Sequence, residues 1–473
     1  MNSKSKRYIL QGFTGLLFIL FPFINIFILT SIFLIIYLSL KHLPENKTIF
    51  TYIKYELFNE NERFQEKINS TISNFRALFL STLILLLIAS ILEFTPYYLP
   101  IFIISSAFAL SIFGDITGTI INEHKKSKQE LKQQLMELRD NSAIKKCRFC
   151  TLPSTIGFLA VGIIAAFIAG AWTSFHASGT VPYNIIFFVS VIGSMTGALF
   201  ESIPSRIDDM LSVPLSAAMI MWLFFDFGYS VSPYELTAAL IFSFFLASLA
   251  YKVKIADISA LISAAILGVL IIVFSNMLWF VLLLTFFILG GMFTKYRYKY
   301  KESIGIAQSK GGVRTYDNVL SNSLTALALA VSYGIFQQYS EVILYAYLGA
   351  VATATGDTLA SEIGTTAKGK PRMVTNLKVA EPGADGAVSP LGELAALFGS
   401  AVIGILALFF GLAEDPLLVV SITAFSGFIG TNIDSFMGAT LQKKDLLSNS
   451  GVNFVATVAG ALIAGVLFLL VTA

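Results

Sequence analysis

Residues 451–472 read GVNFVATVAGALIAGVLFLLVT, a run without charged side chains that is long enough to cross the hydrocarbon core of a bilayer as an α-helix. Similar blocks recur along the 473-residue chain, which is 56% hydrophobic and 13% charged and has a mean hydropathy of +0.76. Backbone groups within a bilayer must pair inside their own segment, which favours helices, and no block alternates as a membrane strand would. The sequence therefore predicts an all-α polytopic membrane protein.

The apolar blocks divide the chain into about 15 candidate transmembrane helices, judged by the length that a bilayer requires. They lie near residues 8–21, 23–40, 76–93, 96–113, 153–174, 183–200, 212–228, 234–251, 255–273, 275–293, 317–336, 341–356, 391–412, 416–430 and 451–472.

Lysine and arginine side chains fall on one side of these spans. If the N-terminus is cytoplasmic, the loops 114–152, 294–316 and 357–390 are also cytoplasmic and are rich in Lys and Arg. The outer loops, such as 175–182 and 229–233, contain neither residue. This asymmetry predicts an integral membrane protein with its N-terminus and these loops in the cytoplasm. The net charge of +3 then implies contact with anionic membrane lipid and no nucleic-acid partner.

Two short motifs occur twice, in the same order. A Gly-Asp pair ends an apolar block at Asp115 and again at Asp357, and an Ile-Asp pair follows two blocks later at Asp208 and at Asp434. We interpret this pattern as an old duplication with its seam near residues 229–233, so that the predicted helices form two duplicated halves.

Carboxylates near the ends of apolar blocks are costly and therefore indicate function. In the second half we assign catalytic roles to Asp357, Glu362 and Asp434. Asp357 and Glu362 fall on one face of a helix together with Thr358 and Ser361. Carboxylate oxygens are the ligands that Mg²⁺ prefers, so Asp357 and Asp434 are the candidate metal ligands and Mg²⁺ is the expected cofactor.

The loop after Asp357 is long, basic and rich in glycine, which suits the binding of a polyphosphate. The candidate substrate-binding and nucleotide-binding residues are Arg314, Asn322, Thr358, Ser361, Lys368, Arg372, Gly383, Asp385, Gly386, Ser389, Asn432, Gln442 and Asn453. Together with the carboxylates they form an inventory for phosphoryl transfer from a nucleotide. The GxxxxGK[ST] pattern is absent, which excludes a P-loop. A secondary transporter with duplicated halves remains the alternative.

The second half resembles the integral membrane family that includes the plant and cyanobacterial phytyl-phosphate kinases. The matching stretches are GIAQSKGGVRTYDNVLSN, ATATGDTLASEIG, GADGAVSPLGELAALFGS, GTNIDSFMGATLQ and NSGVNFVATVAGA. The resemblance implies a CTP-dependent kinase that converts an isoprenyl monophosphate to the diphosphate. A phosphate acceptor is already anionic, so such an enzyme needs cations more than it needs a general base.

The first half resembles the CTP-dependent polyprenol kinases, such as dolichol kinase and phytol kinase, through FGDITGTI and ESIPSRIDDMLSVPLSAA. Its candidate residues are Asp115, Glu201, Asp208 and Asp209. The Lys, Glu and Gly of that family's next motif are replaced here by Cys150, Pro153 and Ser154. This half is therefore either a partner kinase that makes the monophosphate from a prenol or a degenerate structural half.

These inferences give three parts: an N-terminal membrane hairpin and cytoplasmic loop at 1–75, a polyprenol-kinase-like half at 76–230 and a prenyl-phosphate-kinase-like half at 231–473. The expected activity is that of a phosphotransferase. Its expected partners are an isoprenyl phosphate or prenol, CTP or another nucleotide, and membrane lipid. The alternatives are a secondary transporter of a phosphorylated or lipid substrate and a cytidylyltransferase that forms a CDP-lipid.

Overall fold

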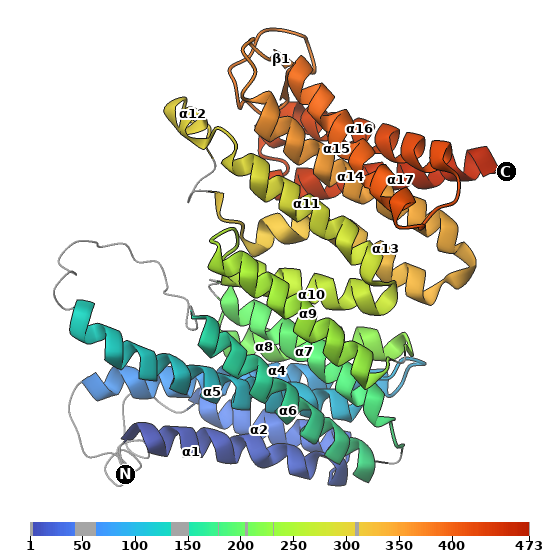
Figure 1. Cartoon of the computed structure of the whole chain (residues 1–473). Helices are drawn as coiled ribbons and strands as arrows, with labels where there is room; N and C mark the ends of the chain where they lie inside the picture. The colour runs from blue at the N-terminus through green and yellow to red at the C-terminus, as the bar shows by residue number, and fades with distance from the viewer. Residues whose placement is uncertain are drawn as a thin grey trace. The chain divides into compact units, whose positions relative to one another are not determined.

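A computed structural model of the chain describes residues 3–42, 63–133, 151–177, 179–203, 207–229, 231–307 and 312–472. The described chain divides into two compact units, Met1–Tyr234 and Glu235–Ala473, which are treated separately below (Figure 1). Cys150, like Lys310, lies outside the described residues.

The first unit is built from helices in the part of the chain that the structure describes. They are α1 (Ser3–Gly15), the 3₁₀ helix η1 (Leu16–Phe23), α2 (Ile26–His42), α4 (Arg63–Leu92), α5 (Ile101–Gln133), α6 (Leu152–His176), α7 (Tyr183–Ser202) and α8 (Asp209–Asp226).

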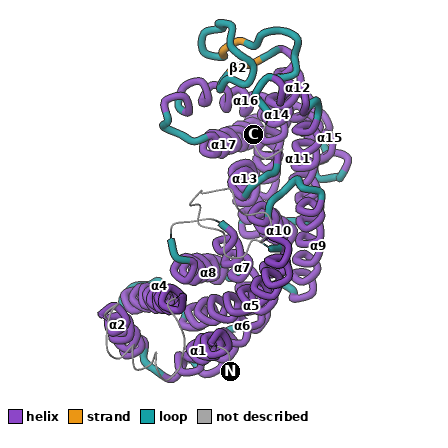
Figure 2. Tube along the Cα trace, turned by 90° about the vertical axis from the view of Figure 1, so that its left-hand side faces the viewer, coloured by secondary structure: helices purple, strands orange, loops and turns teal. Residues whose placement is uncertain are grey.

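The second unit is also helical and adds one small hairpin. Its elements are α9 (Pro233–Lys252), α10 (Ile258–Phe274), α11 (Met277–Lys295), α12 (Tyr298–Ser303), α13 (Tyr316–Ile335), η3 (Gln337–Tyr339), α14 (Ser340–Gly364), β1 (Arg372–Met373), β2 (Ala387–Val388), α15 (Pro390–Phe409), α16 (Pro416–Thr440), η4 (Gln442–Lys444) and α17 (Asn449–Thr472). The two-residue strands pair antiparallel, and β2 contacts α16 (Figure 2).

Twelve helices of the described residues are long and apolar enough to cross a membrane. The all-α fold class is confirmed. Three shorter apolar helices, Tyr8–Phe23, Ile26–Lys41 and Ile258–Phe274, fall where the sequence predicts further spans. The count of 15 stays a prediction, because these three are shorter than a helix that crosses the bilayer unaided.

Helix α14 is the centre of the second unit. It packs against α11, α13, α15, α16 and α17. Of its most apolar 18-residue stretch, 89% is buried, the largest share among the candidate spans. Small residues permit this packing. A Cβ atom on Gly349 would lie 2.4 Å from the carbonyl oxygen of Gly460 in α17, and one on Gly356 would lie 2.7 Å from Ser400 Oγ in α15. Helix α14 is therefore fixed on several sides, which positions the residues at its C-terminal end.

The same helix pairings occur within each unit. In the first unit α5 packs against α4, α6, α7 and α8, and α7 packs against α6 and α8; α4 also contacts α8. Replacing α4–α8 in order by α13–α17 reproduces each of these pairs in the second unit. This correspondence supports the proposal of a duplication.

The correspondence changes one detail of the proposed repeat. The sequence motif aligns Asp208 with Asp434, but Asp208 caps the N-terminus of α8, where its Oδ1 accepts a hydrogen bond from Met210 N at 2.9 Å. Asp434 lies inside α16, near its C-terminal end. The residue at the corresponding end of α7 is Glu201. By helix position, Glu201 is thus the counterpart of Asp434.

Candidate functional site

A polar cavity of about 300 Å³ lies at one end of the second unit. Here α14 and α16 end and α13, α15 and α17 begin, and the segment from Pro371 to Ser389, which carries the hairpin, lines the same cavity. The N-termini of three helices therefore approach the cavity with the positive ends of their dipoles, which favours a bound anion. We call it the acidic cavity, after its carboxylates.

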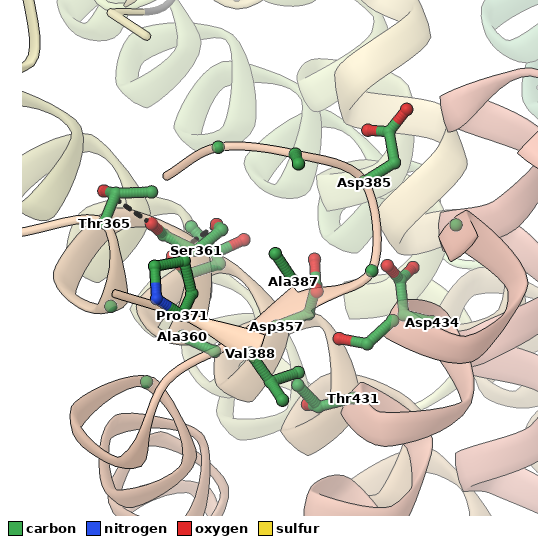
Figure 3. Close-up of a pocket in the computed structure, with 18 of the residues that line it drawn as sticks. Asp357, Ala360, Ser361, Thr365, Pro371, Asp385, Ala387, Val388, Thr431 and Asp434 are labelled. Atoms are coloured by element: carbon green, nitrogen blue, oxygen red, sulfur yellow. Dashed lines mark hydrogen bonds between the residues drawn. The ribbon is translucent and has the colours of Figure 1, made fainter. Parts of the chain in front are cut away.

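Four carboxylates line the acidic cavity. Asp357 comes from α14, Glu393 from the first turn of α15, Asp434 from α16 and Asp385 from the loop before β2. Figure 3 shows Asp357, Asp385 and Asp434 around the same space. Residues separated along the sequence are thus brought together by packing of α14 against α15 and α16.

Helix geometry explains which residues of α14 reach the cavity. Asp357, Thr358 and Ser361 line it, because these positions share one face of the helix. The preceding residue, Gly356, lies close to α15 and α16. A Cβ atom added to it would lie 2.9 Å from Thr431 Oγ1 and 3.0 Å from the carbonyl oxygen of Ala396. The glycine therefore lets the helix carrying Asp357 approach the helix carrying Asp434.

Arg314 is the only Lys or Arg, within the described residues, that lines the acidic cavity. Its backbone is fixed by a hydrogen bond from its own N–H to the carbonyl oxygen of Ile255 at 2.7 Å, and by one from Asp257 N to its carbonyl oxygen at 3.0 Å. Burial lowers the pKa of Arg314 from its ordinary value, whereas the charges of Glu362 and Asp357 raise it. Arg314 thus places a positive charge in the lining of the acidic cavity, on a backbone fixed by two hydrogen bonds.

Glu362 does not line the acidic cavity. It is 5% exposed and forms a buried ion pair with Lys301 of α12, and its Oε1 accepts a hydrogen bond from the Thr294 hydroxyl of α11 at 2.8 Å. Thr294 Oγ1 also accepts a hydrogen bond from Arg314 Nη2 at 3.4 Å. The sequence placed Glu362 among the catalytic residues; the structure places it behind Arg314.

Three further predicted residues lie outside the cavity lining. Lys368 is exposed on the loop, and Arg372 Nη1 donates a hydrogen bond to the carbonyl oxygen of Leu377 at 2.8 Å. Asn432 Nδ2 donates to Glu393 Oε2 at 3.0 Å, so it contacts a lining residue without lining the cavity itself. The basic side chains Lys368 and Arg372 of the loop therefore do not contribute to the lining of the cavity, contrary to the prediction.

The remaining predicted residues of the second half do line the acidic cavity: Arg314, Asn322, Thr358, Ser361, Gly383, Asp385, Gly386, Ser389, Gln442 and Asn453, with Asp357 and Asp434. Gly386 has a φ of +76°, and an added Cβ would lie 2.5 Å from the carbonyl oxygen of Ser435. This contact requires glycine, because only glycine combines that backbone conformation with so close an approach to α16. The loop with Asp385 can therefore lie against the helix that carries Asp434.

Several lining residues were missed by the sequence reasoning. They include Asn318, Thr365, Thr431, Ser435 and Asn449. Asn318 with Asn322, and Asn449 with Asn453, are each four residues apart in the first turns of α13 and α17, so each pair shares a helix face. That spacing was a usable signal for an amide-lined wall.

The carboxylates of the cavity have the ligand atoms that a hard divalent cation prefers, but they do not form a complete metal site by themselves. Their oxygens are the ligand type that Mg²⁺ selects. Within the described ranges, however, no group of three or more His, Cys, Asp or Glu side chains is arranged to hold a metal ion. A metal at Asp357 and Asp434 would therefore complete its coordination with substrate phosphate oxygens or water, as Mg²⁺ at nucleotide sites commonly does.

The first-unit candidates have different surroundings. Asp115 and Glu201 are 2% and 6% exposed, and Asp209 begins α8 next to the capping Asp208. An added Cβ on Gly114 would lie 2.9 Å from the ring of Phe158. Gly114 therefore packs against an aromatic ring, whereas Gly356 packs against hydroxyl groups of Ser400 and Thr431.

Together these features define a polytopic all-α membrane protein with a carboxylate-lined cavity in its second unit. The family described as "Integral membrane protein DUF92" matches residues 241–461. An uncharacterized membrane protein of Methanocaldococcus jannaschii is 34% identical over 219 residues, which are 46% of this chain and 88% of that protein. The chain belongs to the integral membrane family DUF92.

Two relatives come from Arabidopsis thaliana. Protein PGR is 31% identical over 267 residues, covering 47% of this chain and 92% of the relative. Protein VTE6, chloroplastic, is 28% identical over 192 residues, covering 39% of this chain and 57% of the relative. No solved structure matches the chain. Family membership supports the membrane location; the cytoplasmic side of the N-terminus stays a prediction.

Proposed function

We propose that the second unit is a prenyl-phosphate kinase, a phosphotransferase that moves a phosphoryl group from a nucleotide to an isoprenyl monophosphate. The observation that carries this proposal is the acidic cavity, which unites Asp357, Asp385 and Asp434 with a half-buried Arg314 at one end of a membrane helix bundle. Carboxylates suit a magnesium nucleotide, and an arginine suits a phosphate dianion.

The reaction requires little of the protein beyond placement of charges. An oxygen of the acceptor phosphate attacks the γ-phosphorus, and this P–O bond forms as the bond from the γ-phosphorus to the β–γ bridging oxygen breaks. The electron pair leaves with the nucleoside diphosphate, and no proton has to move. Accordingly no general base is needed, and the cost that must be reduced is the repulsion between two anions.

The chain's own residues divide this task. Asp357 and Asp434 would hold Mg²⁺, which when bound neutralises charge on the nucleotide phosphates. Arg314 offsets charge directly, and the helix N-termini of α13, α15 and α17 add a favourable field. Asp385 lies on the loop that also lines the cavity, so nucleotide binding and loop position are coupled.

The resemblance of the second half to the phytyl-phosphate kinases supports the choice of a prenyl acceptor and of CTP as donor. Membership of an integral membrane family is compatible with an acceptor whose hydrocarbon tail lies in the bilayer. For the first unit we propose the degenerate, structural role, because the polyprenol kinase motif is replaced at Pro153 and Ser154, Asp115 is buried and Phe158 packs against the neighbouring Gly114.

Position-specific labels test the proposal and separate it from its alternatives. Purified, monodisperse protein is incubated with geranylgeranyl phosphate and CTP labelled at either the α- or the γ-phosphate, and with ATP in a parallel series. A kinase transfers only the γ-label to the lipid, giving the diphosphate. Transfer of the α-label would indicate a cytidylyltransferase. No transfer of either label, with uptake of prenyl phosphate by proteoliposomes, would indicate a transporter and contradict the proposal.

A further inference from the structure

Two cavities meet at Arg314. Besides the acidic cavity, the second unit has a small cavity of about 10 Å³ lined by Phe286, Phe287, Gly290, Arg314 and Asn318. It shares Arg314 and Asn318 with the acidic cavity. Arg314 therefore lies at a boundary between a carboxylate-lined space and an aromatic wall on α11.

We infer that this boundary is the acceptor subsite: Arg314 binds the phosphate of the prenyl monophosphate, and the hydrocarbon chain leaves along Phe286, Phe287 and Gly290 of α11. The inference rests on the proposed function and deepens it, because it separates the acceptor from the donor. The donor nucleotide then occupies the side of the acidic cavity with Asp357, Asp385 and Asp434.

Charge is the first argument for this division. A nucleotide triphosphate enters as a magnesium complex, and carboxylates bind it through the metal. A prenyl monophosphate brings no metal of its own and needs a direct cation in a site that is otherwise acidic. Among the described residues, Arg314 alone supplies one in this cavity. Its planar guanidinium can donate two hydrogen bonds to one phosphate, which a lysine cannot do in the same geometry.

The groups behind Arg314 hold it without neutralising it, which is the second argument. Arg314 donates to Thr294, and Thr294 donates to Glu362. Glu362 is paired in turn with Lys301, whose Nζ also donates to the carbonyl oxygen of Phe293 at 3.0 Å. Lys301 forms the direct ion pair with Glu362, so Glu362 reaches Arg314 through Thr294, and the charges of Glu362 and Asp357 favour the charged form of Arg314, which is the form that binds an anion. A buried ion pair of this kind fixes geometry more than it adds stability.

The aromatic wall supplies the third argument. Phe286 is 3% exposed within the core of α11 and α14, and Phe287 packs against Ala260, Leu267 and Val319. An apolar wall beside a half-buried arginine matches a ligand with a phosphate head and a hydrocarbon chain, and it does not match a nucleotide, whose ribose and base are polar.

Gly290 lines the small cavity at the start of this proposed route. A Cβ added there would lie 3.3 Å from Thr358 Cγ2 and 3.5 Å from Arg314 Nη2. A branched side chain at this position would fill the small cavity and press on the guanidinium. The glycine is therefore a site where a substitution can block the hydrocarbon route while the carboxylates remain in place.

Kinetics with a short and a long acceptor test the assignment. Dimethylallyl phosphate has a chain short enough to stay in the acidic cavity, whereas geranylgeranyl phosphate must leave it. We expect Gly290→Val to raise KM for geranylgeranyl phosphate about tenfold or more, the scale of one misfitting group in an apolar pocket. KM for dimethylallyl phosphate should rise less, because only the contact with the guanidinium is affected, and KM for the magnesium nucleotide should change little. Gly290→Ala, with a milder clash, is the control for folding.

Arg314→Gln is the complementary variant. It should raise KM for both acceptors by about tenfold to a hundredfold, as expected for loss of a charged hydrogen bond, and leave KM for the magnesium nucleotide nearly unchanged. If Arg314→Gln raised KM for the nucleotide instead, Arg314 would belong to the donor site and the inference would be overturned. It would also be overturned if Gly290→Val had the same KM for geranylgeranyl phosphate as the wild type. Wild-type protein that forms no diphosphate from any acceptor would remove the proposed function, and this assignment with it.

Discussion

The two Gly-Asp pairs of this chain have the same sequence and opposite surroundings. Gly114 in α5 faces the ring of Phe158 from α6, and Asp115 is 2% exposed. Gly356 in α14 faces the hydroxyl groups of Ser400 and Thr431, and Asp357 lines a cavity. Since the helix pairings around both are the same, the difference comes from side chains on the neighbouring helices.

That difference shows how, in the described residues, similar helix pairings can surround two Gly-Asp pairs with different side chains. In the first unit, a large aromatic ring fills the space beside the dipeptide, and the acids at Asp115 and Glu201 are enclosed by the bundle. In the second unit, Ser400 and Thr431 pack against Gly356, Asp357 lines the acidic cavity, and the loop with Asp385 approaches α16 through Gly386. The dipeptide alone therefore does not identify the functional half.

The largest expected contrast is between the paired aspartates. Asp357→Asn should lower kcat/KM for diphosphate formation by roughly two to three orders of magnitude, because a charge at a phosphoryl centre is lost while shape is kept. Asp434→Asn should do the same. Asp115→Asn, the matched change in the first unit, should leave turnover per folded molecule close to wild type.

Rates are measured on monodisperse protein in detergent, so that folding and catalysis are separated. If both second-unit variants turned over at near wild-type rates, the metal-site assignment would be wrong, although the fold would stand. A large loss in Asp115→Asn would show that the first unit contributes directly.

The second contrast concerns the acceptor. We expect labelled diphosphate from geranylgeranyl phosphate and little or no labelled monophosphate from free geranylgeraniol, because the first unit lacks the Lys, Glu and Gly expected near Pro153 and Ser154. Chromatography of the labelled products measures both reactions in one assay. Robust conversion of the prenol that disappeared in Asp115→Ala would overturn the structural role given to the first unit.

The third contrast concerns packing at the two glycines. Gly356→Ala should destabilise the protein by about 1–3 kcal/mol, because its Cβ would meet a backbone oxygen of Ala396 and overpacked helices relax poorly. For Gly114→Ala, the nearest neighbours of the added Cβ are ring atoms of the buried Phe158 and not backbone, and a side chain can shift more readily than two packed backbones, so the cost should be smaller. Thermal unfolding in detergent compares them, and equal midpoints would show that α14 and α15 are free to separate.

The smallest contrast concerns the residues behind Arg314, which have no counterpart among the first-unit candidates. Thr294→Val removes the hydroxyl between Arg314 and Glu362 and should raise acceptor KM about threefold to tenfold, the scale of one ordinary hydrogen bond because the effect on the acceptor is indirect, with kcat nearly unchanged. Thr294→Ser, which keeps the hydroxyl group, should have an acceptor KM close to that of the wild type. A variant that lost folded protein but kept wild-type KM would show that Thr294 acts only in stability.

Much of the architecture follows from the sequence alone. Runs such as 451–472 require helices because a bilayer offers no partner for backbone N–H and C=O groups. The carboxylates Asp357 and Asp434 were identified by their cost in apolar surroundings, and both line the cavity. Composition and local pattern are sufficient for such conclusions because each depends on the segment and its solvent.

Only the tertiary structure decided which polar residues share a site. Ser361 and Glu362 are neighbours in the sequence, yet one lines the acidic cavity and the other pairs with Lys301. Adjacent helix positions point about 100° apart, so the neighbouring helices determine which of the two meets the cavity. Lys368 and Arg372 lie outside the cavity lining on a loop that reaches it through Pro371, Gly383 and Asp385. Long-range packing sets these directions, and no local pattern in the sequence encodes it.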